Sequence, residues 1–425
     1  MKKKILCWSD FVGSATGFST VARNILQALH STGLYEIDQL AINYTGSFYD
    51  REQFPYNIVS AKLEDPSDPY GQQMFANTLL AKEYDIVLII NDPFVVQKIA
   101  EKIGDIRKTK QSVNHHDFDL VYYFPVDCRL WKGMSTMIEV ADLAIPYTNF
   151  AVKKAKEIGL SVSEPIYHGT EIKNFYPLPK EEKKALRRQW FHIEDDNTFL
   201  LINVNRNTIR KDISKTILAF SEFHKEVPNS VLYLHTAMVD SAAPGTMLDL
   251  KPCIFDLGLN PKKDIIFPTK FNPAKGFPVN ILNQFYNAAN AYITTSLGEG
   301  WGLNQVDAMC AGIPVIAPNN TSSPEIFGEK NERGYLYECE EQIYLESSGY
   351  RPVGRLEEIL RNIRNCYQGW KFQSQEHIKR IQDARSWVIE HSWENIGKQW
   401  IKLFSELKRH ERRVQIYENQ KVEQI

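Results

Sequence analysis

Short apolar runs alternate with amphipathic stretches along nearly the whole chain, and this alternation constrains the fold more than any other feature. In the first part of the chain we expect strands at residues 4–8, 35–44, 84–90, 120–126 and 141–147, and helices at 19–30 and 150–159. Strands that alternate with helices are typical of a parallel sheet packed between helices. The sequence therefore predicts the doubly wound α/β class.

The pattern breaks at residues 171–198, where two prolines, a charged helix and a polar turn follow one another. It then starts again. Further strands are expected at residues 198–205, 230–236, 264–269, 291–296, 313–318 and 334–337, with helices at 212–223 and 278–290. We therefore predict two Rossmann-like domains facing a cleft, at 1–175 and 176–385. A helical segment, 386–425, is expected to pack back on the first domain.

The composition excludes several classes of protein. A length of 425 residues exceeds one hydrophobic core, and a formal net charge of -2 makes nucleic acid an unexpected default partner. The six cysteines show no C-x-x-C spacing, which favours a reducing compartment over a disulfide framework or zinc site. No apolar window approaches the roughly 20 residues needed to span a bilayer. We expect a cytoplasmic protein, with peripheral membrane contact left open.

The stretch SLGEGWGLNQVDAMCAGIPVIAP, residues 296–318, is the most informative motif. Gly298, Gly300 and Gly302 allow close backbone approach, and the free N–H groups of the helix expected near Leu303 favour an anion. Glu299 and Asp307 flank that turn and would repel a phosphate unless each met hydroxyl donors. The expected ligand combines phosphate with a polyol, as a nucleotide sugar does. The turn alone is a weak signal.

A second loop, NVNRNTIRKD, follows the strand at residues 198–205 and carries Arg206 and Lys211. Two cations beside an anion-binding helix start suit a pyrophosphate, because arginine can bind two oxygens and lysine adds a point charge. The alternative is that both, with Arg210, are solvated loop charges.

Taken together, these segments resemble a family-4 retaining glycosyltransferase of the GT-B fold. GEGWGLNQVDAMCAGIPVIA resembles that family's E-x7-E signature, and NRNTIRKDISKTILAF resembles its Arg and Lys pair ahead of a helix. IYHGTEIKNFYPLP is similar to its interdomain turn, and SATGFSTVARNIL to its N-terminal glycine loop. The ending HSWENIGKQW is also similar. One departure is that Asp307 stands where the family usually has Glu.

The resemblance implies a role for each matching residue. Glu299 would hold hydroxyls of the donor sugar, Asp307 would bind the ribose, and Arg206 with Lys211 would neutralise the diphosphate leaving group. The remaining donor-binding candidates are the backbone of Gly300, Trp301, Gly302 and Leu303, the closing loop with Gly13 and Gly17, and Glu325.

The first domain departs from the family by offering Asp127 where a His is usual. Asp127 is expected to face the reacting sugar or to bind acceptor, and Asn91 with Asp92 are further acceptor-side candidates. His168 is expected to be a hydrogen-bonded structural residue. The run from His115 to Asp117 suggests metal ligands, but neighbours on an extended chain point opposite ways. No metal or other cofactor is expected.

The sequence thus predicts a retaining hexosyltransferase that moves a sugar from a nucleoside diphosphate donor to an unidentified acceptor, which could be a glycan, lipid, protein or modified DNA base. Three alternatives remain open: a nucleotide-sugar epimerase, a nucleic-acid base glycosyltransferase, and a binding protein with a decayed site. The nucleotide base, the sugar and the oligomeric state are not predicted.

Overall fold

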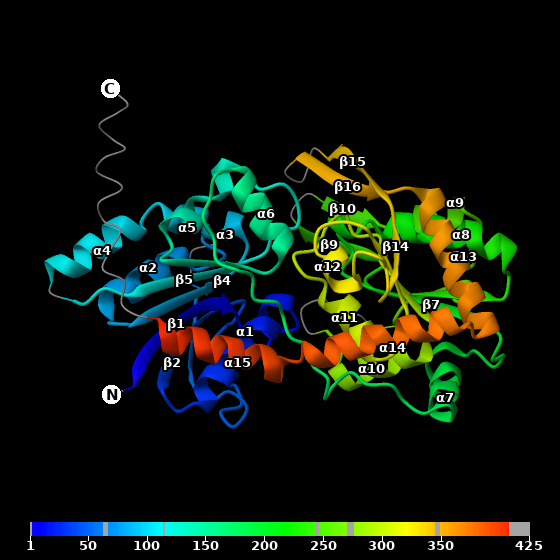
Figure 1. Cartoon of the computed structure of the whole chain (residues 1–425), viewed down its shortest axis with the longest axis horizontal. Helices are drawn as coiled ribbons and strands as arrows, with labels where there is room; N and C mark the ends of the chain where they lie inside the picture. The colour runs from blue at the N-terminus through cyan, green and yellow to red at the C-terminus, as the bar shows by residue number, and fades with distance from the viewer. Residues whose placement is uncertain are drawn as a thin grey trace.

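The computed structural model describes residues 2–62, 67–113, 115–243, 246–269, 276–344 and 349–407. Within these ranges the chain forms two lobes side by side, each built on a six-stranded sheet (Figure 1). All the strand pairs in both sheets are parallel. The predicted α/β class with two Rossmann-like units is confirmed.

The first sheet has the strand order β3-β2-β1-β4-β5-β6. Its strands are β1 (Lys3–Asp10), β2 (Tyr35–Ile42), β3 (Asn57–Ser60), β4 (Ile86–Ile90), β5 (Asp119–Phe124) and β6 (Leu143–Pro146). The helices of this lobe are α1 (Gly17–Ser31), α2 (Gln72–Ala81), α3 (Pro93–Ala100), α4 (Ile103–Ser112), α5 (Thr136–Val140) and α6 (Asn149–Glu157), with a short turn η1 (Lys132–Met134). β3 and α2 to α5 were not predicted.

The second sheet repeats this topology with the order β11-β8-β7-β12-β13-β14. Its strands are β7 (Phe199–Val204), β8 (Ser230–His235), β11 (Ile265–Ile266), β12 (Ala291–Ile293), β13 (Val315–Pro318) and β14 (Tyr335–Tyr337). The helices are α7 (Lys180–Phe191), α8 (Ile213–Glu226), α9 (Lys251–Asp256), α10 (Val279–Ala288), α11 (Leu303–Cys310) and α12 (Ser323–Phe327), with a short turn η2 (Ile209–Lys211). β12 ends three residues earlier than predicted, and α11 begins at the predicted residue.

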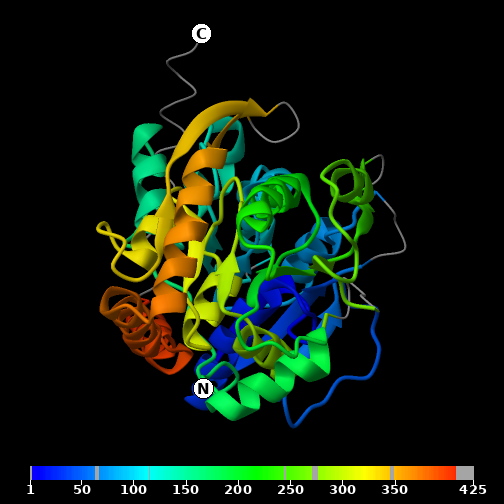
Figure 2. The same cartoon turned by 90° about the vertical axis from the view of Figure 1, so that its right-hand side faces the viewer.

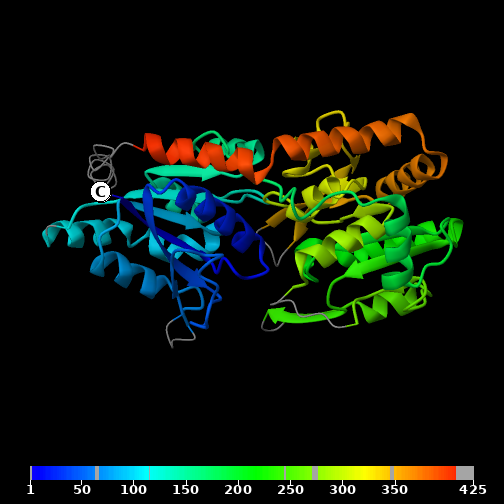
Figure 3. The ribbon, with the colours of Figure 1, turned by 90° about the horizontal axis from the view of Figure 1, so that it is seen from below.

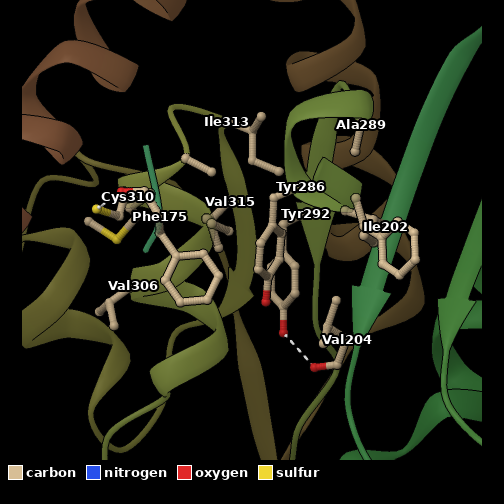
Figure 4. Packing of buried hydrophobic residues seen from close by; sticks show 14 of the residues in the cluster. Phe175, Ile202, Val204, Tyr286, Ala289, Tyr292, Val306, Cys310, Ile313 and Val315 are labelled. Atoms are coloured by element: carbon tan, nitrogen blue, oxygen red, sulfur yellow. Dashed lines mark hydrogen bonds between the residues drawn. The ribbon is translucent and has the colours of Figure 1, made fainter. Parts of the chain in front are cut away.

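Both sheets are buried on both faces, which explains their continuous apolar runs. In β7, Leu200 and Ile202 pack into one core, whereas Phe199 and Leu201 pack into the core on the opposite face. Figure 2 views the second lobe from its free end, with helices around the sheet. In the first of these cores, Val306 and Cys310 of α11 pack near Tyr292 of β12 (Figure 4). This packing fixes the helix that follows the glycine-rich turn.

Two antiparallel hairpins were not predicted. β9 (Val239–Ala243) pairs with β10 (Thr246–Asp249), and β15 (Cys339–Tyr344) pairs with β16 (Gly349–Gly354). The β15–β16 hairpin extends from the second lobe toward the first (Figure 1).

The last helices are α13 (Leu356–Phe372), α14 (Gln375–Glu390) and α15 (Trp393–Glu406). α14 lies along the second lobe and α15 along the first, so the chain crosses between the lobes at residues 391–392 (Figure 3). Trp400 and Phe404 of α15 are buried in a core cluster of the first lobe. The return of this helix, predicted from the sequence, is confirmed.

The chain crosses between the lobes twice, and the two crossings lie side by side. Thr170 donates its backbone N–H to His391 O at 2.9 Å and accepts from Trp393 N at 3.2 Å. Phe175, the last residue of the proposed first domain, packs in the core of the second lobe. The divisions at 175 and 385 remain proposals. Among the described helices, none is both long and apolar enough to cross a membrane.

Candidate active site

The glycine-rich turn of the second lobe leads from β12 into α11 at the carboxyl edge of the sheet. Gly302 is the N-cap residue of α11, with φ at +106°, a conformation that favours glycine. The backbone N–H groups of Gly300, Trp301 and Gly302 donate to no residue within the described part of the chain. Together with the free amides of the first helical turn, they form a set of donors suited to an anion.

Glu299 lies at the centre of this turn and is 8% exposed. Its carboxylate forms ion pairs with Lys211 and with Arg210, whose Nη1 lies 2.9 Å from Oε2. Burial would raise the pKa of Glu299, but the two cations outweigh it and lower the pKa to about 2. Glu299 is therefore a fixed anion. Its backbone N–H is held by Thr321 Oγ1 at 3.0 Å.

The two cations come from the loop after β7. The short turn Ile209–Lys211 brings consecutive residues to the same carboxylate. Burial lowers the pKa of Lys211, although Glu299 opposes this. Lys211 thus lies where the sequence predicted a cation next to the glycine-rich turn.

Arg206 differs from its prediction. It pairs with Asp240 at 3.2 Å, at the start of the β9–β10 hairpin, and its side chain is 51% exposed. The cation that accompanies Lys211 is instead Arg210, which the sequence brings in only under the alternative of solvated loop charges. The spacing of residues gave no signal for Arg210, because only the tight turn before Lys211 directs both side chains to Glu299.

Asp127 approaches the same group from the first lobe. Its Oδ2 lies 3.3 Å from Arg210 Nε, and its Oδ1 lies 3.1 Å from Nη1 of Arg351 in β16. Arg351 also donates to the backbone O of Asp127 at 2.7 Å. Asp127, Arg210 and Glu299 therefore form one chain of alternating charges across the two lobes. This agrees with the predicted cleft-facing position of Asp127.

Two glycines of the turn serve the contact between the lobes. A Cβ on Gly298 would lie 2.0 Å from the backbone O of Asp127, and one on Gly300 would lie 2.5 Å from Cβ of Pro125. From the sequence, these glycines are expected only to allow close approach of an anion. In the structure, side chains at either position would push the lobes apart.

The N-terminal loop lies opposite the head of α11. Gly17 is the first residue of α1, and a Cβ there would lie 3.4 Å from Cδ1 of Leu303. Gly13 lies in the preceding turn, where a Cβ would meet the Phe11 ring at 2.6 Å. The starts of α1 and α11 thus face one another, as the predicted closing loop requires.

Asp307 lies in the second turn of α11 and is partly exposed. Within the described residues its carboxylate has no hydrogen-bond or ion-pair partner. Burial, with Glu171 nearby, raises the pKa of Asp307 well above its ordinary value. An acid without a protein partner one to two turns into the helix is available for hydroxyl groups of a ligand.

The side chains of Trp301 and Glu325 both contact other parts of the protein. The Trp301 ring is 3% exposed and packs near Tyr167, with 4.9 Å between ring centroids, so only its backbone faces the turn. Glu325 accepts from the backbone N–H groups of Asn149 and Phe150 at 2.9 and 2.7 Å, and from Tyr167 Oη at 2.8 Å. Its two carboxylate oxygens hold the start of α6 in this structure, and its contact near the nucleotide stays a prediction.

Two of the histidines noted in the sequence, His168 and His116, have protein partners. His168 Nδ1 lies 2.7 Å from Tyr123 Oη, and burial lowers the pKa of His168 to about 3, so its prediction as a hydrogen-bonded residue is confirmed. His116 lies 3.2 Å from Glu83 and 3.7 Å from Asp85. Over the described ranges, no three His, Cys, Asp or Glu residues are grouped for a metal ion.

Comparison with known proteins bears on the turn and the helix just described. Residues 270–346 match the family described as glycosyl transferases group 1. This segment is similar to a glycosyltransferase domain. It contains Glu299, Asp307 and the glycine-rich turn, whereas Arg210 and Lys211 precede it.

Solved structures match nearly the whole chain. Sucrose-phosphate synthase from Thermosynechococcus elongatus is similar with a TM-score of 0.71 and 16% identity, covering 95% of this chain and 98% of that one. Anabaena HepE in complex with UDP-glucose is similar with a TM-score of 0.68 and 17% identity, covering 95% and 100%. The two lobes therefore have the GT-B fold of these structures.

The relatives found by sequence match a smaller share of this chain than the solved structures do. An uncharacterized glycosyltransferase of Methanocaldococcus jannaschii is 26% identical over 242 residues, which are 56% of this chain and 53% of that protein. Alpha-monoglucosyldiacylglycerol synthase of Acholeplasma laidlawii is 25% identical over 178 residues, 41% of this chain and 40% of that protein. The matched region thus spans about half the length of these relatives, or less.

Proposed function

We propose that the protein is a retaining glycosyltransferase that moves a sugar from a nucleoside diphosphate sugar to an acceptor bound by the first lobe. The observation that carries the proposal is the position of Glu299. It is an ionised acid held by Lys211 and Arg210 beside the unpaired amides that precede α11. This arrangement offers cations and N–H donors to a diphosphate and a carboxylate to sugar hydroxyls.

Different residues would bind different parts of the donor. The amides from Gly300 to Gly302 and the start of α11 would receive the diphosphate, with Lys211 and Arg210 stabilising the negative charge that grows on it as it leaves. Glu299 would hold hydroxyls of the sugar, and Asp307 would bind the ribose. Arg206 would have to leave Asp240 to join them.

The reaction breaks the bond between the sugar's anomeric carbon and the diphosphate oxygen and forms a bond from that carbon to the acceptor hydroxyl oxygen. In the front-face route implied by the family resemblance, the departing diphosphate oxygen accepts the proton of the acceptor hydroxyl, and the configuration is retained. No metal is needed in this proposal, because cationic side chains and a helix N-terminus face the leaving group.

The donor is tested first by thermal shift with UDP, GDP and ADP and their sugars, since ligand bound to the native state raises apparent stability. UDP-glucose is the first donor to try, because HepE binds it. Products of a transfer reaction are then analysed by NMR for the anomeric configuration. Stabilisation by none of these compounds, with no release of a nucleoside diphosphate, would refute the proposal.

Variants of Glu299 and Asp307 would distinguish the proposed roles of these two acids. Glu299→Ala should depress turnover strongly with a modest loss of nucleoside diphosphate affinity, because that ligand lacks the sugar. Asp307→Ala should weaken the nucleoside diphosphate itself by roughly 1 to 3 kcal/mol. Lys211→Ala and Arg210→Ala should weaken the diphosphate about 10-fold or more, as loss of a charge-assisted hydrogen bond predicts. Lys225→Ala, which removes a lysine 65% exposed on α8, is the matched control.

A further inference from the structure

Three neighbouring strands of the first sheet lead to acidic residues at one edge. Asp10 is the last residue of β1, Asp92 follows β4, and Asp127 follows β5. These strands are adjacent in the order β1-β4-β5, and their carboxyl ends lie together because the sheet is parallel. The backbone O of Asp127 contacts Gly298, so this edge lies directly against the turn that holds Glu299.

The three acids differ in their partners. Asp127 is paired with Arg210 and Arg351, as described above. Asp10 accepts from Thr16 Oγ1 at 2.6 Å. Asp92 is the N-cap residue of α3 but makes no side-chain cap hydrogen bond, and among the described residues its carboxylate has no ion-pair partner. Burial, with Asp127 and Asp10 nearby, raises the pKa of Asp92 to about 7 although Arg210 opposes this.

An independent observation comes from Tyr147, which follows β6 in the same sheet. Its side chain is 3% exposed, and its hydroxyl has no hydrogen-bond partner among the described residues. The pKa of Tyr147 is raised by burial and by the charges of Tyr123, Asp92, Tyr122 and Asp10, so the hydroxyl lies within electrostatic range of both acids at this edge. Its ring also lies 3.7 Å from the position of a Cβ on Gly300, at the boundary with the second lobe.

A third group without a partner is Nδ2 of Asn91, which is 4% exposed. Its Oδ1 accepts from Asp92 N at 2.9 Å, so this amide lies beside the backbone of Asp92. The edge therefore offers a carboxylate that accepts, an amide that donates and a phenol that does both. A buried polar group without a hydrogen-bond partner lowers the stability of the fold, and hydroxyl groups of a ligand could form hydrogen bonds with the carboxylate, the amide and the phenol.

We propose that Asp92, Tyr147 and Asn91 bind the acceptor, and that the acceptor is an uncharged, hydroxyl-rich group such as a neutral saccharide. The proposal rests on the glycosyltransferase function above and names its substrate class. A phosphate or carboxylate on the acceptor at this place would meet the carboxylates of Asp92 and Asp10. Arg210 and Arg351, which lie against the adjacent Asp127, are already paired with that carboxylate.

Asp92 is partly exposed, unlike Asn91 and Tyr147, and Phe94 two residues further is 58% exposed. Solvent therefore reaches the start of α3, next to Asp92.

The test uses the full chain with the donor found by thermal shift. Transfer is measured to a panel of neutral saccharides, to sugar phosphates and uronic acids of the same ring type, and to a double-stranded DNA oligonucleotide. We expect neutral saccharides to be used with kcat/KM at least 10-fold above their anionic counterparts, and DNA not to be used. Asp92→Asn should raise the KM for the neutral acceptor at least 10-fold and reduce the ratio of kcat/KM for neutral over anionic acceptors. It should change the affinity for the nucleoside diphosphate less than twofold.

Tyr147→Phe should also raise the acceptor KM. Its matched control is Tyr56→Phe, because the Tyr56 hydroxyl is equally buried and unpartnered in the described structure but its charged neighbour is Arg23. Three results would each overturn the inference. They are equal or better use of anionic acceptors or DNA, an unchanged acceptor KM in Asp92→Asn, and no transfer to any neutral saccharide while the donor still binds. Absence of donor binding and of diphosphate release would instead refute the glycosyltransferase proposal.

Discussion

The ion pairs of Glu299 with Lys211 and Arg210 should stabilise the folded second lobe measurably, and Glu299→Gln tests this. The pKa of Glu299 falls from 4.5 to about 2. A displacement of about 2.5 pH units corresponds to roughly 3 kcal/mol of folding free energy at pH 7. The side chain is only 10% exposed, so solvent screens this interaction little. Removal of one partner from a buried ion pair costs about 3–5 kcal/mol, which agrees with this figure.

The sign of the pH dependence follows from the lowered pKa. The stabilisation by Glu299 is complete above its ordinary pKa and is lost as the pH falls toward 2. The difference between the parent and Glu299→Gln should therefore shrink to about 2 kcal/mol at pH 3.5. For a domain of this size, 3 kcal/mol corresponds to a decrease in Tm of roughly 6–12 °C.

The assay is scanning calorimetry of both proteins between pH 7 and pH 3.5 without nucleotide. The matched control is Glu226→Gln, which also removes a carboxylate paired with an arginine, Arg364, but on the surface with 46% of the side chain exposed. That variant should lose less than about 1 kcal/mol. A decrease in Tm below 2 °C for Glu299→Gln, or a difference that does not narrow on acidification, would refute the reasoning.

Three further predictions concern other parts of the structure. Because the pKa of Asp307 is raised, the fold favours the protonated carboxyl, and the free energy of unfolding should fall as the pH rises above the ordinary carboxyl pKa. In denaturation experiments, Asp307→Asn should not show this fall, and its free energy of unfolding should equal that of the parent at pH 3. Arg351→Ala should reduce the rate of transfer at least 10-fold, because both contacts with Asp127 are lost, while the calorimetric affinity for the nucleoside diphosphate changes less than twofold. The control is Arg129→Ala, which removes the ion pair of Arg129, 53% exposed, with Glu341 of the same hairpin and should have little effect on transfer. Equal losses of transfer in both variants would contradict this prediction. Transfer should survive EDTA, and full loss restored by Mg²⁺ or Mn²⁺ would show that the proposed role of the cationic side chains is wrong.

The sequence predicts the fold well because its main signal, buried strands alternating with amphipathic helices, depends on local patterns. The start of α11 at Leu303 and the return of α15 to the first lobe both followed from such patterns. The contacts between lobes did not. Arg210 reaches Asp127, which lies 83 positions earlier in the chain, and no local pattern encodes such a pair.

The same limit explains Glu325 and the hairpins. The sequence places Glu325 near the predicted nucleotide, but whether it faces the ligand or the start of α6 depends on how the two lobes dock. β15 and β16 carry charged and polar residues with little alternation, so their pairing gave no clear strand signal. Arg351, buried at 4% exposure within β16, was consequently missed as a contact of Asp127.

The position of α15 also sets the order in which this protein can be made. Trp400, which is 0% exposed, fills the core beside α1, yet the ribosome adds it about 250 residues after the last strand of that sheet. At 5–20 residues per second, the first lobe waits roughly 12–50 s for a helix that completes it. During that time the apolar surface under α15 is uncovered, so the nascent first lobe is a natural client for chaperones. A chain shortened before residue 393 would keep that surface exposed permanently.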